Sequence, residues 1–246
     1  FHTRQVKLST SDDAYLRLNA LSRFSSANME KTGHLDFSYG KKRWGMLSSV
    51  SFSDFDDQIM GVGGFPDYEL PMYVRVYNDH DSIFLNTKPN KQVGSGYSQM
   101  NLMQKFRFRP SKSLDIIYAF HYSQTSDVPR YDRLTQYNSD SNLKYAEWSY
   151  GPQVWMMNSL TYVNKKQRKW TDKMKFIFAR QDYKESRHSR KIWDENRYNR
   201  FEEVIVYTLN FDNEKKLKED SYIFYGIDGS YNSISSRSLL FSKRCS

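Results

Sequence analysis

The stretch that decides the fold is GYSQMNLMQKFRFRPSKSLDIIYAFHYS, residues 96–123, in which apolar and polar side chains alternate over two long segments. A period of two is that of a β-strand, whose successive side chains point to opposite faces. The tight turn PSKS at 110–113 separates the two segments. One face of this hairpin carries mostly apolar side chains: Met100, Leu102, Phe106, Phe108, Leu114, Ile116, Tyr118, Phe120 and Tyr122.

The same alternation recurs through most of the chain, whereas apolar spacing of three and four residues is not sustained anywhere. We therefore expect an all-β protein of about nine strands. The expected strands lie near 14–26, 33–40, 44–54, 97–109, 114–124, 144–163, 172–184, 201–212 and 221–233.

Composition limits the class of protein. The 246 residues are 16% aromatic, the mean hydropathy is −0.81, and no apolar run reaches the roughly 18 residues that a membrane helix requires. A helical membrane protein is thereby excluded. A soluble β-protein and a protein that crosses the membrane with strands both remain, because alternation halves the apolar signal of a membrane strand.

Charge and chemistry exclude other classes. The net charge of +9 would suit an anionic partner, but the lysine and arginine runs are typical of solvated turns, and no nucleic-acid-binding pattern accompanies them. We therefore expect no nucleic-acid partner. The single cysteine, Cys245, excludes an internal disulfide. No nucleophile triad, paired carboxylates, phosphate loop or zinc spacing is present, so we expect neither an enzyme nor a cofactor or metal site.

The expected connections alternate in length. Short ones lie at 41–43, 110–113, 164–171 and 213–220, and long polar ones at 55–96, 125–143 and 185–200. In an up-and-down antiparallel sheet, alternate connections lie at opposite ends of the strands. Short turns at one end and long loops at the other are typical of transmembrane β-barrels, which have short periplasmic turns and long extracellular loops.

Strand length also favours a barrel, because strands of about 10 residues suit a tilted membrane crossing and soluble strands average about half of that. The apolar face would meet lipid and the polar face would line water. Aromatic residues near strand ends would form interfacial belts: Trp44, Tyr97, Trp148, Tyr150 and Trp170. The expected fold is an antiparallel up-and-down transmembrane β-barrel, present in part.

Several segments resemble the early barrel strands of TonB-dependent receptors of the Gram-negative outer membrane. They are EKTGHLDFSYGKKRWGMLSSVSFSDFDD (30–57), GSGYSQMNLMQKFRFRP (94–110), SDVPRYDRLT (126–135), AEWSYGPQVWMMNSLT (146–161) and ESRHSRK (185–191). Such receptors hold an N-terminal plug inside a barrel of about 22 strands. The resemblance implies that residues 1–13 are the exit from the plug and 14–246 the N-terminal portion of the barrel. The plug and the later strands would lie outside this fragment.

The resemblance further implies a function. A receptor of this family binds a scarce nutrient and imports it, and the class expected here is an iron chelate, a ferric siderophore or haem. The implied partners are outer-membrane lipid, the small-molecule ligand and the TonB energy-coupling complex, which acts through the missing plug. The alternative is a soluble extracellular β-sandwich that binds carbohydrate, because a sandwich shows the same alternation with its apolar face in the core.

Two groups of residues are candidates for ligand contact. On the expected lumen face a basic wall could attract anionic ligands: Arg17, Arg23, Lys105, Arg107 and Arg109. In the expected long loops, arginine and tyrosine would supply contact area and forked hydrogen bonds: Arg130, Tyr131, Arg133, Arg187 and His188. The alternatives are that the wall pairs with plug carboxylates or keeps the lumen hydrated, and that the loop residues pack against each other.

Acidic residues cluster at SDFDD (53–57) and NDHD (78–81). Clustered carboxylates suit a hard cation such as calcium. Their spacing fits no calcium-loop template, so we expect solvated loops there.

Overall fold

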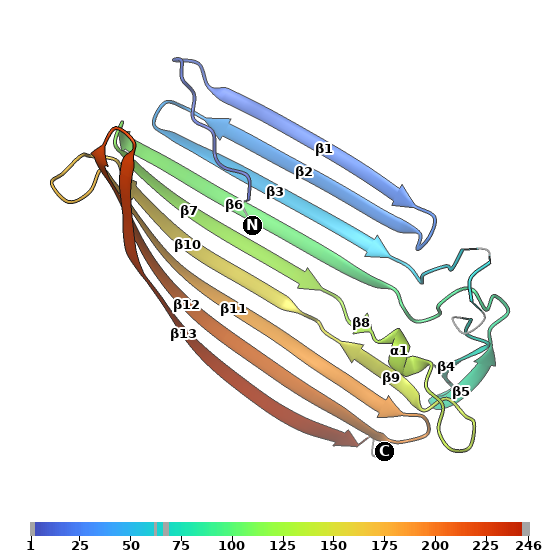
Figure 1. The fold of residues 1–246 in the computed structure, drawn as a ribbon. Helices are drawn as coiled ribbons and strands as arrows, with labels where there is room; N and C mark the ends of the chain where they lie inside the picture. Colours follow the sequence, from blue (N-terminus) through green and yellow to red (C-terminus); the bar gives the residue numbers. More distant parts are fainter. Residues whose placement is uncertain (1–2, 62, 66–68, 243–246) are drawn as a thin grey trace.

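The computed structural model describes residues 3–61, 63–65 and 69–242, in which nearly all regular structure is β-strand (Figure 1). The expectation of an all-β antiparallel protein is confirmed. The one helix, α1 (Tyr131–Leu134), has four residues. The described ranges contain no helix with the length and apolar character that a membrane crossing requires.

One large sheet makes up most of the molecule, with the strand order β1-β2-β3-β6-β7-β10-β11-β12-β13. Each strand in this order pairs antiparallel with its neighbours. The nine strands are β1 (Tyr15–Ser25), β2 (Glu30–Gly40), β3 (Trp44–Phe55), β6 (Tyr97–Ser111), β7 (Leu114–Thr125), β10 (Val154–Asn164), β11 (Lys173–Lys191), β12 (Asn196–Lys218) and β13 (Ser221–Ser242).

Four shorter strands lie in the long connections. β8 (Val128–Pro129) pairs with β9 (Tyr145–Tyr150), and β9 continues the large sheet by pairing with the far end of β11. β4 (Met72–Tyr77) and β5 (His80–Leu85) form a separate hairpin. Its two turn residues, Asn78 and Asp79, have positive φ angles of 49° and 62°, as hairpin turns of two residues require.

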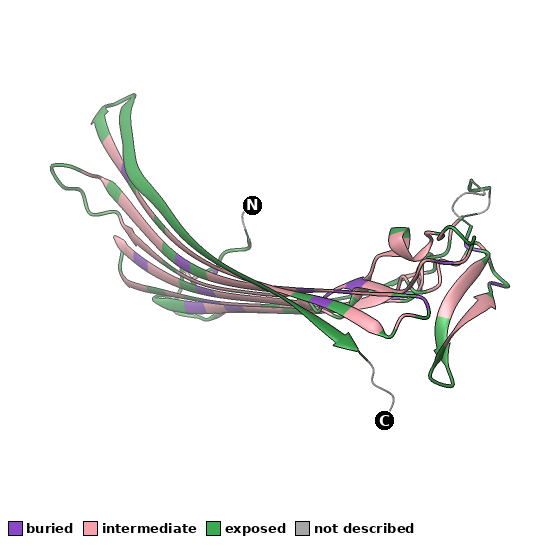
Figure 2. Cartoon of the chain, turned by 90° about the horizontal axis from the view of Figure 1, so that it is seen from below, coloured by how far each residue is buried: buried purple, intermediate pink, exposed green. Residues whose placement is uncertain are grey.

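The sheet is curved and open (Figure 2). Within the described residues it does not close into a barrel, because β1 and β13 each pair on one side only. We call the end with the connections at 41–43, 112–113, 165–172 and 219–220 the short-turn end, and the opposite end the loop end. The loop end lies at the right of Figure 1, where β4, β5, β8, β9 and α1 gather.

Three predicted segments are wrong. The strand predicted at 221–233 continues to Ser242 as β13. The segment 144–163 is two strands, because Gly151 adopts a φ of 107° and Pro152 has no N–H to donate to a ladder. The predicted loop 185–200 is mostly strand, because β11 and β12 continue their pairing and leave only a short turn at 192–195. The polar residues that suggested a loop therefore belong to strand ends. The two other long connections, between β3 and β6 and between β7 and β10, are long as predicted.

The pairing register carries one set of side chains across all nine strands on the same face. Consecutive partners in this row are Leu16, Tyr39, Met46, Phe106, Tyr118, Leu160, Phe178, Leu209 and Gly229. Eight of the nine are apolar or aromatic. The adjacent row, one residue along, faces the other way and is mostly small or polar: Arg17, Ser38, Leu47, Lys105, Ala119, Ser159, Ala179, Thr208 and Ser230.

The N-terminal segment identifies the second face as the concave one. Residues 3–9 run along the concave side of the sheet (Figure 2), where the Lys105 ammonium donates to the Thr3 hydroxyl at 2.5 Å and to the Arg4 carbonyl at 2.9 Å. Val6 is 2% exposed against this face. The apolar row is therefore convex, and six of its eight large side chains are exposed, among them Phe106 at 46% and Leu16 at 65%; Tyr39 and Met46 are half-buried.

Candidate functional site

The predicted basic wall is on the concave face but is already paired. The Arg107 and Arg109 guanidinium groups each donate two hydrogen bonds to the buried Asp115 carboxylate, at 2.8–3.1 Å. Arg107 also donates to the Val6 carbonyl at 3.0 Å. One carboxylate thus holds two cations and the N-terminal segment against the sheet, and these arginines are not free to meet a ligand.

The two arginines of β1 are also on the concave face, near the free edge of the sheet. Arg17 donates to the Asn19 amide oxygen at 3.2 Å, and Arg23 pairs with Glu30 at 2.9 Å. Register places them opposite Ser38 and Thr32 of β2. Strands β2 and β3 separate them from Lys105, Arg107 and Arg109 on β6, so the structure does not bring the five predicted wall residues together as one site.

The loop end brings three of the predicted loop residues together. Arg130 lies over the Trp148 ring at 5.1 Å and the Tyr150 ring at 5.4 Å, measured from the guanidinium carbon to the ring centroid. Arg133 lies over Trp148 at 5.9 Å, and Arg187 lies over Tyr150 at 4.8 Å. We call these five residues the arginine–aromatic cluster. Cation–π contacts of this kind are worth about 0.5–2 kcal/mol each.

Register places this cluster on the concave face. Tyr150 is opposite Arg187, and Trp148 is opposite Ser189. Both rings were expected to form an interfacial belt, and so was Tyr97, whose position opposite Phe55 also faces inward. The belt prediction is wrong for these three residues, because the register turns them away from the convex face. Trp44 lies on the convex face, and Trp170 is exposed in the turn between β10 and β11.

The cluster carries more positive than negative charge. Arg130 makes two hydrogen bonds of 2.6 Å to Asp132, and this contact raises the pKa of Arg130 and lowers that of Asp132. Arg133 lies 3.8 Å from the same carboxylate. Arg187 has no carboxylate partner among the described residues, and its buried Nε has no acceptor. The cluster therefore contains three guanidinium groups, of which two share the Asp132 carboxylate.

Tyr131 contributes packing and not a hydroxyl. Its OH is buried without a hydrogen-bond partner among the described residues. Burial, with smaller effects of Asp57 and Tyr137, raises the pKa of Tyr131 to about 12. A ligand at the cluster would meet arginine side chains and not this phenol.

His188 is not in a loop and does not belong to the cluster. It lies on β11 with its side chain on the opposite face from Arg187, and it is 7% exposed. Its Nδ1 lies 2.5 Å from the Asn199 amide oxygen, and its Nε2 lies 3.1 Å from the Gly151 carbonyl. Because both ring nitrogens are engaged, His188 fixes the break between β9 and β10 and is not open to a ligand.

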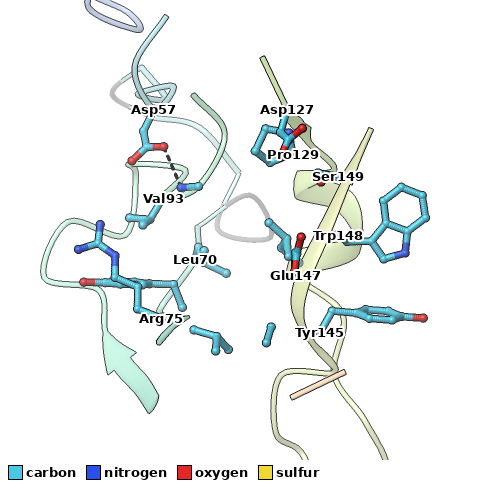
Figure 3. A pocket seen from close by; sticks show the side chains of 15 residues that line it. Asp57, Leu70, Arg75, Val93, Asp127, Pro129, Tyr145, Glu147, Trp148 and Ser149 are labelled. Carbon is cyan, nitrogen blue, oxygen red and sulfur yellow. Dashed lines mark hydrogen bonds between the residues drawn. The ribbon is translucent and has the colours of Figure 1, made fainter. Parts of the chain in front are cut away.

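A cavity of about 400 Å³ lies next to the cluster, between the β3–β6 connection and β9 (Figure 3). In Figure 3 the Tyr145 and Trp148 rings point away from it, whereas Glu147 points toward it. Arg197 holds the Glu147 carboxylate at 2.9 and 3.0 Å. Asp57 accepts hydrogen bonds from the Gly94 and Ser95 amides at 2.8 and 2.9 Å. The charged groups of this cavity thus hold the loops together.

The acidic residues singled out in the sequence do not form a cation site. Asp81 accepts two hydrogen bonds of 2.6 Å from Arg190 and one of 2.8 Å from the Trp193 amide, so it fastens the β4–β5 hairpin to the turn after β11. In the part of the chain that the structure describes, no three His, Cys, Asp or Glu side chains are grouped to hold a metal ion. Residues 1–2 and Cys245 lie outside the described residues.

The comparisons with known proteins give no family model, no curated protein and no solved structure that matches the chain. The functional argument therefore depends on the geometry of this molecule.

Sequence reasoning found Arg130, Arg133 and Arg187 but missed their aromatic partners. Trp148 and Tyr150 are two residues apart on one strand, next to the Gly-Pro break. A period of two puts them on one face, so this spacing was the available signal. What sequence could not give is the pairing of β9 with β11, which sets Arg187 beside Tyr150.

Two phenylalanine substitutions separate the roles of the tyrosines. We expect Tyr131→Phe to leave the free energy of unfolding unchanged or to raise it by about 1 kcal/mol, because it removes a buried hydroxyl without a partner. Tyr150→Phe removes the hydroxyl that accepts from Arg130 at 3.1 Å, so we expect a loss of about 0.5–1.5 kcal/mol. Denaturant unfolding in detergent measures both. A larger loss for Tyr131→Phe than for Tyr150→Phe would contradict this assignment.

Proposed function

We propose that the chain forms the N-terminal part of the transmembrane β-barrel of a TonB-dependent receptor in the outer membrane of a Gram-negative bacterium. The observation that carries this proposal is the apolar convex row that continues across eight strands, from β1 to β12, without a covering layer among the described residues. Large contiguous apolar surfaces on soluble monomers are rare and mark interaction with another protein or with lipid.

The free energy gained by burying this face favours lipid as its partner. Each fully buried Leu or Phe side chain gains about 1.5–3 kcal/mol over exposure to water, and the convex face offers such side chains on every strand from β1 to β12. Charges on this face are concentrated beyond the apolar stretch of β11 and β12, toward the loop end. On β11 and β12 these are Arg180, Asp182, Lys184 and Glu203. Lys31, Asp54 and Arg237 also lie toward the loop end, and Lys215 lies at the short-turn end.

The concave face supports a hydrated interior. Its rows contain lysine, arginine, serine, asparagine and threonine, and residues 3–9 lie against it. A segment held on the inside wall just before the first strand suits the exit from a plug, as proposed for residues 1–13, with residues 14–246 in the barrel. On this proposal the TonB complex acts through the plug, which the described residues do not include.

The open edges suit a partial barrel. A membrane-embedded sheet cannot leave strand edges unpaired, because each free N–H and C=O in lipid costs several kcal/mol. β1 and β13 each have such an edge within the described chain. On the receptor proposal, further strands of the same receptor pair with them.

A soluble β-sandwich is supported less well. A sandwich requires a second sheet packed over the apolar face. In the described ranges the only other sheet is the β4–β5 hairpin, which lies beyond the loop end of the large sheet (Figure 2).

Neighbouring residues on β10 test the orientation of the sheet. We expect Leu160→Arg, on the convex face, to block membrane assembly, because arginine on the lipid side costs roughly 2–4 kcal/mol at the midplane. Ser159→Arg, on the concave face among the small side chains Ala119 and Ala179, should assemble nearly as the parent does. Folding into lipid vesicles, followed by the protease-resistant fraction, measures both. Equal defects would rule out this orientation.

For the ligand, we infer an anionic iron chelate that bears carboxylates, received at the arginine–aromatic cluster. The support is the excess of guanidinium groups and the unpaired Arg187, since arginine binds carboxylates with forked hydrogen bonds. A siderophore is favoured over haem because the histidine of this region, His188, is buried and has both ring nitrogens engaged.

A matched pair of arginines tests the ligand class. We expect Arg187→Gln to weaken binding of ferric citrate by roughly tenfold or more, since a hydrogen bond between charged groups is worth about 1.5–3 kcal/mol. Arg43→Gln, in the exposed turn at the short-turn end, far from the cluster, should leave it unchanged. Isothermal titration of the chain in detergent measures both. Equal losses, or equal binding of a neutral ferric chelate, would exclude the cluster as a carboxylate site.

A further inference from the structure

Two methionines face the polar concave wall. Six methionines lie in strands of the large sheet, and the register puts four of them on the convex side: Met46, Met100, Met156 and Met174. The other two, Met103 and Met157, point to the concave side with the lysines, serines and asparagines. Other apolar side chains, such as Leu47, Ile117 and Ile177, also lie on the concave side, so what distinguishes the two methionines is the residue that they share as a partner.

Both of these methionines are direct partners of one histidine. Met103 of β6 is opposite His121 of β7, and Met157 of β10 is opposite His121 on its other side. The three side chains therefore project from one row on the same face. Adjacent strands lie about 4.8 Å apart, and direct partners have Cβ atoms about 4.5–5.5 Å apart. The flexible methionine side chains can thus bring both sulfur atoms to the imidazole between them.

The imidazole of His121 is half-buried and open to a new partner. Neither ring nitrogen makes a hydrogen bond to any described residue, and the ring contact in its surroundings is Trp155, with centroids 6.0 Å apart. His188, by contrast, has both nitrogens engaged. The chain therefore leaves this imidazole available on the wall.

The neighbours of the three side chains limit which ion would fit. The concave residues flanking His121 on its own strand are Ala119 and Ser123, and Lys105 is opposite Ala119. None is a carboxylate, which a hard cation would require. The positive charge of Lys105 repels a divalent ion more strongly than a monovalent one. Two thioethers and an imidazole match a soft cation such as Cu(I).

We propose that Met103, His121 and Met157 form a binding site for a soft monovalent metal ion, Cu(I) or its redox-stable analogue Ag(I), on the concave wall of the sheet. The site involves no redox step. It does not depend on the loop-end cluster or on the identity of the ligand received there. It would give the polar face a second binding function, for a bare soft cation.

Competition for Cu(I) tests the proposal with matched methionine pairs. The full chain in detergent, without oxygen, is titrated against the coloured Cu(I)–bicinchoninate complex. We expect one Cu(I) per chain to be withdrawn. Loss of an outer-shell partner of a metal ligand costs roughly 10–100-fold in affinity, so Met103→Leu with Met157→Leu, which removes two ligands, should weaken binding by at least that much, and His121→Asn should do likewise. The control Met100→Leu with Met156→Leu changes methionines of the same strands, β6 and β10, that lie on the convex face, and should bind as the parent does.

Each outcome decides the question. The proposal is wrong if the parent does not bind Cu(I). It is also wrong if the concave double variant (Met103→Leu, Met157→Leu) and the convex double variant (Met100→Leu, Met156→Leu) lose the same amount of Cu(I) affinity. If the double variant Met103→Leu, Met157→Leu binds Cu(I) as tightly as the parent, the two methionines are not ligands and only pack against Trp155, as sulfur does with aromatic rings. A variant that loses its strand signal in circular dichroism is misfolded and cannot be used. In that case the test is whether Ag(I) shifts the magnetic resonance signals of the His121 imidazole in the parent protein. An unmoved His121 resonance excludes the site, and a shifted one supports it.

Discussion

The antiparallel register is the constraint on which the rest of the structure depends. Because side chains alternate with a period of two, a single alignment such as Phe106 opposite Tyr118 fixes the face of every other residue on both strands. The same alignment passes from β1 to β13, and a slip of one residue on any strand would turn the apolar side chains of that strand to the other face. The apolar row thus specifies the register, and the register in turn builds the polar wall behind it.

That wall is organised by charge pairing more than by free charge. Asp115 binds both Arg107 and Arg109, and Arg107 and Lys105 hold the N-terminal segment. A buried pair that loses one partner costs about 3–5 kcal/mol, so these groups act first as the attachment of residues 3–9. The positive charge left for a partner is at the loop end, where Arg187 has aromatic contact and no carboxylate among the described residues. Net charge alone would have assigned ligand binding both to the arginines around Asp115 and to the arginines at the loop end.

Much of the fold could be predicted because alternation is a local signal. The strands around Phe106 and Phe120 follow from sequence, and so do the short turn after Arg109 and the long connections after β3 and β7. The extension of β11 and β12 could not be predicted, because the residues there are mostly polar on both faces and show no apolar alternation, although Ser186, His188 and Asn199 are buried. The approach of Arg187 to Tyr150, and of Met103 and Met157 to His121, depends on which strands become neighbours. Parity gives the face of each residue, but only the register shows its partner.

The central claim is that the convex face meets hydrocarbon and the concave face meets water, and a spin-label scan of β10 tests it most directly. Single nitroxides at 154–164 in lipid vesicles are exposed to oxygen, which concentrates in the bilayer, and to a water-soluble nickel chelate. We predict collisions with oxygen at the even positions, including Met156 and Leu160, and with the nickel chelate at the odd ones, including Met157 and Ser159. Accessibility to the nickel chelate at every position, or an alternation of the opposite phase, would contradict the account.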